Sequence, residues 1–267
     1  MAWLQRFLSS VLPAGRRGNF EFDCAAITDC GLVRAENQDH LVVYRGRAAF
    51  CVADGMGGGE GGAKASEIVC GHFTRAVARR TGFADRIRRV DESVCAANTA
   101  IRKFADVAGY RHMGSTVAAL VFDAFDSGKA AVGSVGDSRV YRYRGGALEQ
   151  LTRDHTMANE LCRRSRGIVM NSGLSGRASA LSHVLTRAVG IEQSVEVEWR
   201  QVDFRAGDWF MLCSDGLYDM VDADGIRSAF ASGGRPRDVA MRLAAGAVLG
   251  GALDNYSVIV VKVRARR

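Results

Sequence analysis

Residues 48–58 read AAFCVADGMGG, and this stretch carries the strongest structural signal in the chain. Its apolar run favours a buried β-strand, and Asp54 closes that strand. The glycines that follow let the backbone approach closely whatever the carboxylate binds. A carboxylate at the end of a buried strand is costly unless positive charge compensates it. The stretch therefore predicts a strand that ends in a cation site, with a structural turn as the alternative.

A phosphate-cradling loop is a second alternative for the same glycines, because a helix is predicted to follow them. The lysine and hydroxyl residue that end such a loop are missing, and Asp54 would repel a phosphate in the absence of a metal. The backbone carbonyl of Gly55 could itself serve as a metal ligand.

Three further carboxylates stand beside predicted buried strands. Asp137 lies between two strands in Gly136-Asp137-Ser138-Arg139, Asp215 follows the strand that ends at Cys213, and Asp254 precedes the last strand. Each alone is also typical of a turn, where aspartate accepts hydrogen bonds from nearby backbone N–H groups. Together with Asp54 they predict one oxygen-ligand site for hard divalent cations, assembled by folding.

Composition narrows the class of protein. The chain has 267 residues, is 48% hydrophobic, and carries a net charge of +7. Its seven cysteines are odd in number and include no C-x-x-C pair, which favours reduced thiols in a cytoplasmic protein. The basic residues are mostly arginine and are not interleaved with aromatic residues, so no nucleic-acid partner is expected. The positive charge reflects either coding bias or attraction to anionic partners.

The first 18 residues are expected to be separate from the globular domain. Apolar residues recur at helical spacing over residues 1–13, and residues 14–18 resemble a linker. The segment lacks the basic region and cleavage site of a signal peptide. It could dock on the domain, on a partner or peripherally on a membrane surface. We predict a domain over residues 19–264.

Hydrophobic periodicity predicts an α+β fold. Tight turns separate many of the strands, so neighbouring strands should pair antiparallel, and the helices should cover the sheets. Residues 156–183 are expected to be irregular. The expected strands are 20–27, 41–44, 48–53, 116–122, 129–135, 139–143, 147–151, 195–204, 209–213 and 256–263, and the expected helices are 63–80, 86–107 and 236–249.

An ordered set of short motifs resembles the type 2C (PPM) family of metal-dependent protein serine/threonine phosphatases, in its compact bacterial form. The resemblance covers residues 20–263, and its specificity comes from the order of the motifs. They are Arg34…Asn37-Gln38-Asp39, Asp54-Gly55-Met56-Gly57-Gly58, Met113-Gly114-Ser115-Thr116, Gly136-Asp137-Ser138-Arg139, Leu151-Thr152-Arg153-Asp154-His155, Leu185-Thr186-Arg187-Ala188-Val189-Gly190, Ser214-Asp215-Gly216 and Asp254-Asn255.

The resemblance implies a four-layer α-β-β-α sandwich of two antiparallel sheets flanked by helices. It implies that Asp54 bridges two Mn²⁺ or Mg²⁺ ions and that the Gly55 carbonyl binds one of them. Asp215 and Asp254 would hold the first ion, and Asp39 would serve the second directly or through water. Asp137 would form a weaker third site with Asp215.

The implied activity is hydrolysis of phosphoserine and phosphothreonine in proteins by a metal-bridging hydroxide, with Arg34 binding the phosphate. Asp54, Asp215 and Arg34 are the expected catalytic residues. Met56 stands where some relatives have a histidine that protonates the leaving oxygen, so the general acid is unassigned. Gln38 replaces a frequent acidic residue, which could weaken the second metal site. One alternative is a catalytically inactive relative that binds phosphoproteins, and another is a metal-dependent hydrolase that acts on a small phosphate ester.

Residues 156–183 match the position of the family's mobile flap. The segment carries Arg163, Arg164, Arg166 and Arg177 against a single acid, Glu160, so it could select acidic phosphoproteins or simply be a solvated loop. His155 and His183 border it and are expected to be structural. We expect a monomer that opposes a bacterial kinase, in the cytoplasm or within a secretion or envelope regulatory complex.

Overall fold

The computed structural model describes residues 19–57, 61–123, 127–164 and 181–266. The predicted amphipathic segment at residues 1–13 lies outside the described residues. Residues 165–180 of the predicted flap also lie outside them. Within the described part of the chain, no helix is both long and apolar enough to span a bilayer.

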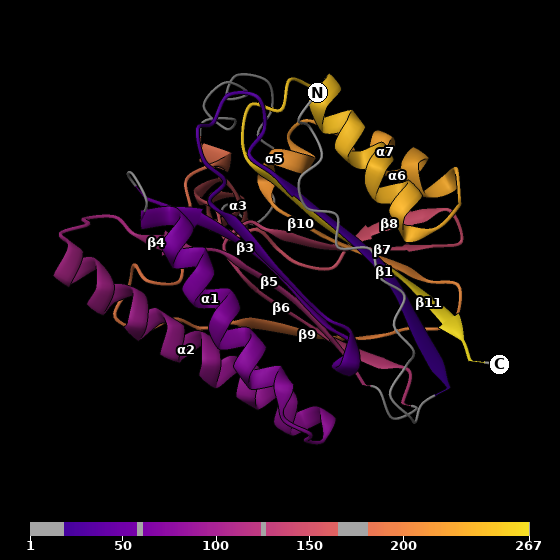
Figure 1. Cartoon of the computed structure of the whole chain (residues 1–267), viewed down its shortest axis with the longest axis horizontal. Helices are drawn as coiled ribbons and strands as arrows, with labels where there is room; N and C mark the ends of the chain where they lie inside the picture. Colours follow the sequence, from indigo (N-terminus) through magenta and orange to yellow (C-terminus); the bar gives the residue numbers. More distant parts are fainter. Residues whose placement is uncertain (1–18, 58–60, 124–126, 165–180, 267) are drawn as a thin grey trace.

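Two antiparallel sheets form the centre of the molecule (Figure 1). The first sheet has the order β1 (Phe20–Asp29), β11 (Tyr256–Ala265), β10 (Trp209–Cys213), β7 (Arg139–Arg144) and β8 (Ala147–Gln150). The second has the order β2 (Asp39–Tyr44), β3 (Ala49–Met56), β5 (Val117–Phe122), β6 (Lys129–Val135) and β9 (Glu198–Asp203), and β4 (Gly114–Ser115) pairs with β3.

Helices cover the outer face of each sheet (Figure 1). The long helices α1 (Gly61–Ala78) and α2 (Phe83–Ala108) pack on the second sheet, and α6 (Ala223–Ala231) and α7 (Pro236–Leu249) lie over the first. The shorter elements are the 3₁₀ turn η1 (Arg45–Arg47), α3 (Met157–Arg164) and α5 (Asp215–Tyr218). This arrangement confirms the predicted four-layer α+β sandwich.

Strand β3 shows why its sequence is a continuous apolar run. Phe50 and Val52 point into the core between the two sheets, whereas Ala49, Cys51 and Ala53 pack against the helices. Because both faces of the strand are buried, every position favours an apolar side chain until Asp54. Asp54 follows this buried run in β3 and lines the cavity described below.

The structure corrects three of the predicted elements. Residues 157–164 form helix α3 within the segment predicted to be irregular, and residues 223–231 form α6, which the sequence analysis missed. The carboxylate of Asp222 caps α6 by accepting a hydrogen bond from the Gly225 N–H at 2.8 Å, a signal that the sequence did contain. The strand expected at 195–204 is shorter, because pairing with β6 covers only Glu198–Asp203.

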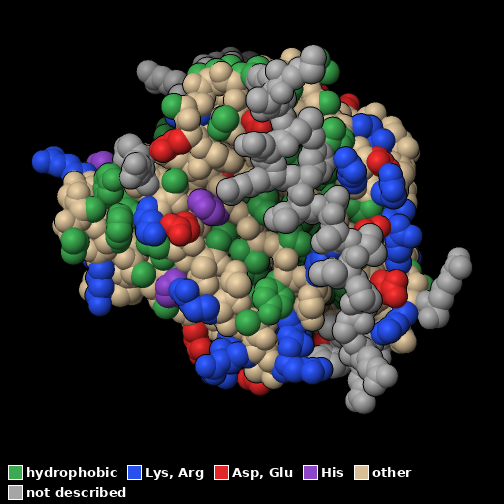
Figure 2. All heavy atoms as spheres, in the orientation of Figure 1, with side chains coloured by type: hydrophobic (Ala, Val, Ile, Leu, Met, Phe, Trp, Pro, Cys, Tyr) green, Lys and Arg blue, Asp and Glu red, His purple; other side chains and the backbone are tan. Residues whose placement is uncertain are grey.

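The basic side chains are spread over the surface rather than gathered in one groove on the face in view. Figure 2 shows Lys and Arg along the lower edge and right side of this face, with Asp and Glu among them. Many arginines form ion pairs, such as Arg88 with Glu92 at 3.1 Å and Arg264 with Asp23 at 2.9 Å. Exposed pairs of this kind contribute little to stability.

Candidate metal centre

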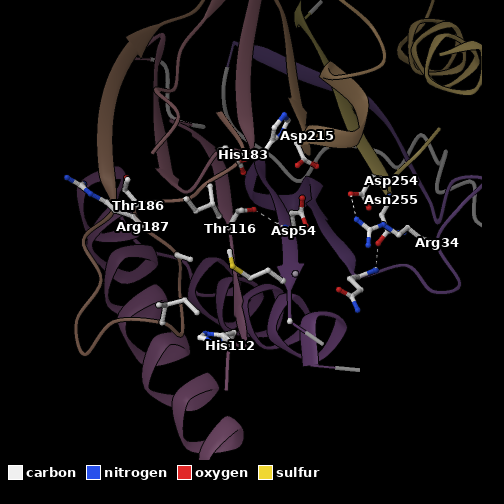
Figure 3. Close-up of a pocket in the computed structure, with 18 of the residues that line it drawn as sticks. Arg34, Asp54, His112, Thr116, His183, Thr186, Arg187, Asp215, Asp254 and Asn255 are labelled. Carbon is white, nitrogen blue, oxygen red and sulfur yellow. Dashed lines mark hydrogen bonds and ion pairs between the residues drawn. The ribbon is translucent and has the colours of Figure 1, made fainter. Parts of the chain in front are cut away.

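The ends of several strands meet at a cavity of about 780 Å³, which holds most of the predicted site residues. Figure 3 shows three of its carboxylates and the Arg34 guanidinium around one space. The predicted site residues that line the cavity are Arg34, Asp54, Gly55, Asp137, Asp215 and Asp254. Asp39, the remaining one, is not among the lining residues and is 4% exposed.

Two hydrogen bonds to Thr116 hold the Asp54 backbone in place. Its N–H donates to the Thr116 hydroxyl oxygen at 2.9 Å, and the Thr116 N–H donates to the Asp54 carbonyl at 2.8 Å. The Thr116 hydroxyl also shares a 2.6 Å hydrogen bond with Ser138, in the turn that carries Asp137. Thr116 thus links the end of β3 to the β6–β7 turn.

Asp39 lies directly opposite Asp54 in the β2–β3 ladder. Its Oδ2 accepts a 2.6 Å hydrogen bond from the Ser214 hydroxyl, whereas its buried Oδ1 has no hydrogen-bond partner among the described residues. Burial raises the pKa of Asp39 to about 7, and the nearby Asp215 and Asp254 carboxylates add to the rise. An unpaired, desolvated carboxylate oxygen of this kind needs a proton or a cation nearby.

Gly55 is required by the close packing of α1 on β3. Its N–H donates to the Gln38 carbonyl at 3.1 Å. A Cβ at this position would lie 2.0 Å from the Gly62 carbonyl oxygen, well inside van der Waals contact. The backbone of residue 55 therefore reaches the cavity wall only because it carries no side chain.

Like charge crowds the centre of the cavity. Burial raises the pKa of Asp54 well above its ordinary value, and the Asp39, Asp215 and Asp137 carboxylates raise it further. The pKa of Asp215 is raised by burial and by Asp254, and that of Asp137 rises to about 7 through burial and Asp215. Clustered carboxylate oxygens with an uncompensated negative charge fit hard divalent cations such as Mg²⁺ or Mn²⁺.

Arg34 supplies a cation at the rim. Its Nη2 lies 2.7 Å from Oδ2 of Asp254, and its side chain is 58% exposed. The hydrogen bond to Asp254 is the main reason that the pKa of Arg34 is raised. The guanidinium is therefore charged and open to a ligand that enters the cavity.

Asn255 braces the loop that carries Arg34. Its side-chain amide donates to the carbonyls of Cys30 and Glu36 at 3.0 and 2.8 Å, and its Oδ1 accepts from the Gln38 N–H at 2.9 Å. A single side chain thus satisfies three backbone groups of the β1–β2 loop, which fixes Arg34 beside Asp254.

A model of the family described as "Protein phosphatase 2C" matches residues 33–237 of the chain. The chain belongs to the protein phosphatase 2C family. It is 34% identical over 240 residues to the serine/threonine protein phosphatase PstP of Mycobacterium tuberculosis. That alignment covers 90% of this chain and 44% of PstP, so the chain spans less than half the length of this relative. It is 30% identical to the protein phosphatase PhpP of Streptococcus pneumoniae, over 90% of this chain and 97% of PhpP.

Solved structures of protein phosphatase 2C relatives share the fold. The catalytic domain of PstP in complex with two manganese ions has a TM-score of 0.79 and 32% identity, covering 92% of this chain and 99% of the other. PppA, a key regulatory component of T6SS in Pseudomonas aeruginosa, has a TM-score of 0.78 and 31% identity, covering 92% and 98%. The chain therefore has the fold of these protein phosphatase 2C relatives.

Two side chains beside the predicted protein phosphatase 2C site were not expected from the sequence. His183 lines the cavity, and its Nδ1 lies 3.7 Å from Oδ2 of Asp219. One ligand atom from each of His183, Asp215 and Asp219 falls within 4.8 Å of the others. Asp219 stands four residues after Asp215, and the Asp219 N–H donates to the Asp215 carbonyl at 2.9 Å. That i, i+4 spacing could have identified Asp219, since it places two residues on one helix face.

The two histidines at the flap differ in their surroundings. His155 is 1% exposed, with Nδ1 accepting from the Gly136 N–H at 3.1 Å and Nε2 lying 3.1 Å from a Glu198 oxygen, which confirms its structural role. His183 is largely exposed at the cavity, so its predicted structural role is not supported by burial.

Proposed function

We propose that residues 19–264 form the catalytic domain of a metal-dependent protein serine/threonine phosphatase. One observation carries the proposal: a single cavity brings the Arg34 guanidinium together with the carboxylates of Asp54, Asp215 and Asp254. A guanidinium binds two phosphoryl oxygens at once, and the carboxylates supply hard ligands for divalent cations.

The same cavity suggests how two Mn²⁺ or Mg²⁺ ions are shared among the ligands. Asp54, central among the acids, is assigned to both ions, with the Gly55 carbonyl as a ligand of one. Asp215 and Asp254 are assigned to the first ion. Their mutual repulsion in the metal-free protein supports this assignment, because cations would replace it with attraction.

Asp39 and Asp137 are assigned supporting roles. Asp39 is buried behind the cavity and accepts a hydrogen bond from Ser214. We therefore propose that it would bind the second ion through a water molecule rather than directly. Asp137 adds a further carboxylate that interacts with Asp215, and a weaker third ion is proposed between these two residues.

When bound, a pair of divalent cations lowers the pKa of water and so supplies hydroxide at neutral pH. Arg34 holds the phosphoryl group in line for attack and neutralises the charge that develops on its oxygens. Met56 lines the cavity and can donate no proton to the leaving serine or threonine oxygen. Cys51 and Cys213 are fully buried among core side chains, so neither thiol can reach a phosphoprotein as a nucleophile.

The proposed substrates are phosphoproteins made by a serine/threonine kinase. Arg187 adds positive charge to the cavity wall, and Arg163 on α3 adds positive charge to the flap, although Arg163 also pairs with Glu160 at 3.1 Å. The similarity to PppA supports a secretion or envelope regulatory complex as a partner. A monomeric state, the absence of a nucleic-acid partner and a cytoplasmic location stay predictions.

Hydrolysis of a phosphothreonine peptide with and without Mn²⁺ tests the proposal. Wild-type protein should release phosphate only with the cation, EDTA should abolish release, and Asp54→Asn and Asp215→Asn should be inactive although folded. Activity that survives EDTA or either substitution would contradict the assignment. The alternative, an inactive phosphoprotein-binding relative, predicts peptide binding without phosphate release under every metal condition. The cavity retains Arg34, Asp54, Asp215 and Asp254, so it offers no support for this alternative.

A further inference from the structure

The cavity has a wall that lies apart from Arg34. Figure 3 shows Arg34 on one side of Asp54 and Arg187 on the other. The loop that carries Arg187 continues along the cavity, and Ile191 is part of the lining. Of the large apolar side chains that are exposed in the described part of the chain, Ile191 alone lines the cavity, and it is 41% exposed. Exposed apolar side chains are ordinary on an open surface, but this one lies in the wall of a candidate substrate site.

Backbone pairing fixes the distance between this wall and the metal centre. Gly55 in β3 pairs with Ser115 in β4, and Ser115 pairs in turn with Val189. The Val189 N–H donates to the Ser115 carbonyl at 2.8 Å, and the Ser115 N–H donates to the Val189 carbonyl at 2.9 Å. Neighbouring strands lie about 4.8 Å apart. The backbone of Val189, two residues before Ile191, is therefore about 10 Å from that of Gly55.

A buried side chain of α2 holds the loop around Ile191. The Asn98 Oδ1 accepts a 2.6 Å hydrogen bond from the Gly190 N–H. The Asn98 Nδ2 donates to the carbonyls of Glu192 and Gln193 at 3.0 and 3.4 Å. Asn98 is only 2% exposed. One amide thus binds the backbone on both sides of Ile191, so the position of this residue is fixed before a substrate arrives.

The side chain of Ile191 rests on a glycine. A Cβ at Gly114 in β4 would lie 3.0 Å from Ile191 Cγ1 and 3.1 Å from Ile191 Cδ1. A side chain at position 114 would therefore displace the isoleucine. Glycine within a strand commonly marks such a close approach. The lack of a side chain at Gly114 leaves room for Ile191 to lie over β4 on the cavity wall.

We infer, on the basis of the proposed phosphatase function, that Ile191 selects phosphoproteins with an apolar residue close to the phosphorylated serine or threonine. The phosphoryl group is assigned to Arg34 and the metal ions, so the rest of the substrate extends along the cavity. An extended peptide advances about 3.3 Å per residue, so about 10 Å corresponds to two or three residues. An apolar side chain at that spacing reaches Ile191 and removes apolar surface from water.

The rest of the wall agrees with an apolar contact. Met56 and Leu185 also line the cavity and add apolar surface. Arg187 and Glu192 line it with opposite charges, so charge selects neither an acidic nor a basic side chain at this wall. The cavity volume of about 780 Å³ is in the range of pockets that enclose a whole ligand, about 300–1,000 Å³. It can therefore hold a flanking side chain in addition to the phosphorylated residue.

Phosphothreonine peptides that differ at one position test the inference. Each peptide carries leucine or serine two or three residues before or after the phosphothreonine, and kcat/KM is measured with Mn²⁺. With the wild-type protein, leucine at one of these positions should raise kcat/KM about 10-fold over serine. Ile191→Ser should remove this preference, and Ile191→Thr, which keeps a branched side chain over Gly114, should weaken it. Hydrolysis of p-nitrophenyl phosphate, which has no flanking residue, should be unchanged in both variants.

Two matched variants locate the contact. Val107→Ser, on α2 at a position that is 91% exposed and outside the cavity lining, should keep the preference for leucine. Leu32→Ser, at a 49% exposed position on the loop that carries Arg34, should keep it too. A preference that is lost in Leu32→Ser but kept in Ile191→Ser would move the apolar contact to the Arg34 side and overturn the inference. Equal hydrolysis of leucine and serine peptides by the wild type would also overturn it.

Failure of the proposed phosphatase function would be recognised separately. A protein that hydrolyses neither the peptides nor p-nitrophenyl phosphate lacks that activity, and fluorescence anisotropy of labelled peptides with Mn²⁺ then decides the role of Ile191. The Kd of the serine peptide should exceed that of the leucine peptide about 10-fold in the wild type and be about equal to it in Ile191→Ser. Equal Kd values in the wild type would contradict selection by Ile191.

Two further readings complete the test. If Ile191→Ser lowers hydrolysis of p-nitrophenyl phosphate as much as hydrolysis of the leucine peptide, Ile191 supports the metal centre and does not select the substrate. If Ile191→Ser does not fold by circular dichroism, Ile191→Thr takes its place, and an undiminished preference for leucine in that variant contradicts the inference.

Discussion

Asp39 and Asp54 lie directly opposite each other in the β2–β3 ladder, so two carboxylates share one end of a buried strand pair. Like charges at opposed positions destabilise a sheet. Burial and neighbouring carboxylates raise the pKa of both groups, so the ionised form of each carboxyl is unfavourable here. The strand pair is therefore built around a charge that has to be compensated from the cavity.

Replacing either acid should stabilise the metal-free protein. Asp54→Asn and Asp39→Asn each remove one of two repelling buried charges, and we expect the free energy of unfolding at pH 8 in EDTA to rise by about 1–3 kcal/mol. Urea denaturation measures this change. Asp85→Asn, on the exposed surface of α2, is the control and should change stability by less than about 0.5 kcal/mol. A loss of stability in both cavity variants would show that the carboxylates do not repel each other.

The stability of the metal-free protein should fall as pH rises. Asp39 and Asp137 have pKa values raised to about 7 in the folded protein, against about 3.9 when unfolded. Between about pH 4 and pH 7 the folded state thus binds more protons than the unfolded state, so the slope of unfolding free energy against pH is negative.

Thermal unfolding in EDTA should consequently give a higher Tm at pH 5.5 than at pH 8. Saturating Mn²⁺ should raise Tm most at pH 8, because cations then replace the missing protons. A metal-free Tm that increases across this range would be opposite to the expected sign.

Arg34 should matter through its shape as well as its charge. Arg34→Ala is expected to lower kcat/KM for a phosphopeptide by about 10- to 100-fold, since a charged hydrogen bond contributes about 1.5–3 kcal/mol. Arg34→Lys should recover only part of this, because an ammonium cannot bind two phosphoryl oxygens as a planar fork. Arg88→Ala removes an arginine of exposed ion pairs on α2 and serves as the control. Full activity of the lysine variant would contradict bidentate binding.

Gly55→Ala should disrupt folding near the cavity. The new Cβ would fall 2.0 Å from the Gly62 carbonyl oxygen, and neither backbone segment can move without separating α1 from β3. We expect a loss of about 3 kcal/mol or more in unfolding free energy. Gly82→Ala is the matched control, because no atom lies within 4 Å of its added Cβ. Equal stability of the two variants would refute the close approach.

Asn255→Ala should loosen the loop that carries Arg34. The substitution leaves the Cys30 and Glu36 carbonyls and the Gln38 N–H without their partner, at an expected cost of about 2–4 kcal/mol. KM for a phosphopeptide should increase as Arg34 loses its position. Asn159→Ala removes one exposed bond to the Asp154 carbonyl and should change neither quantity appreciably. An unchanged KM in the Asn255 variant would show that the Asn255 hydrogen bonds are not needed for Arg34 to bind substrate.

Much of the fold could be predicted from local patterns. The β3 run and the long α1 and α2 patterns are strong because a buried strand or an amphipathic helix constrains every position it contains. Helices α3 and α6 were missed since each is short, and eight or nine residues give a weak periodic signal. The cap at Asp222 was the available evidence for α6.

The sequence by itself determined which side chains could compose the site, because Asp54, Asp137, Asp215 and Asp254 each follow or precede a strand that has to be buried. It also supplied the amphipathic pattern of residues 1–13. Only the tertiary structure decided that Asp39 lies behind the cavity against Ser214, that Asn255 holds the Arg34 loop, and that Asp219 and His183 stand beside Asp215. Those relationships join residues that are distant along the chain, and strand register and helix packing fix them, not the local sequence around each residue.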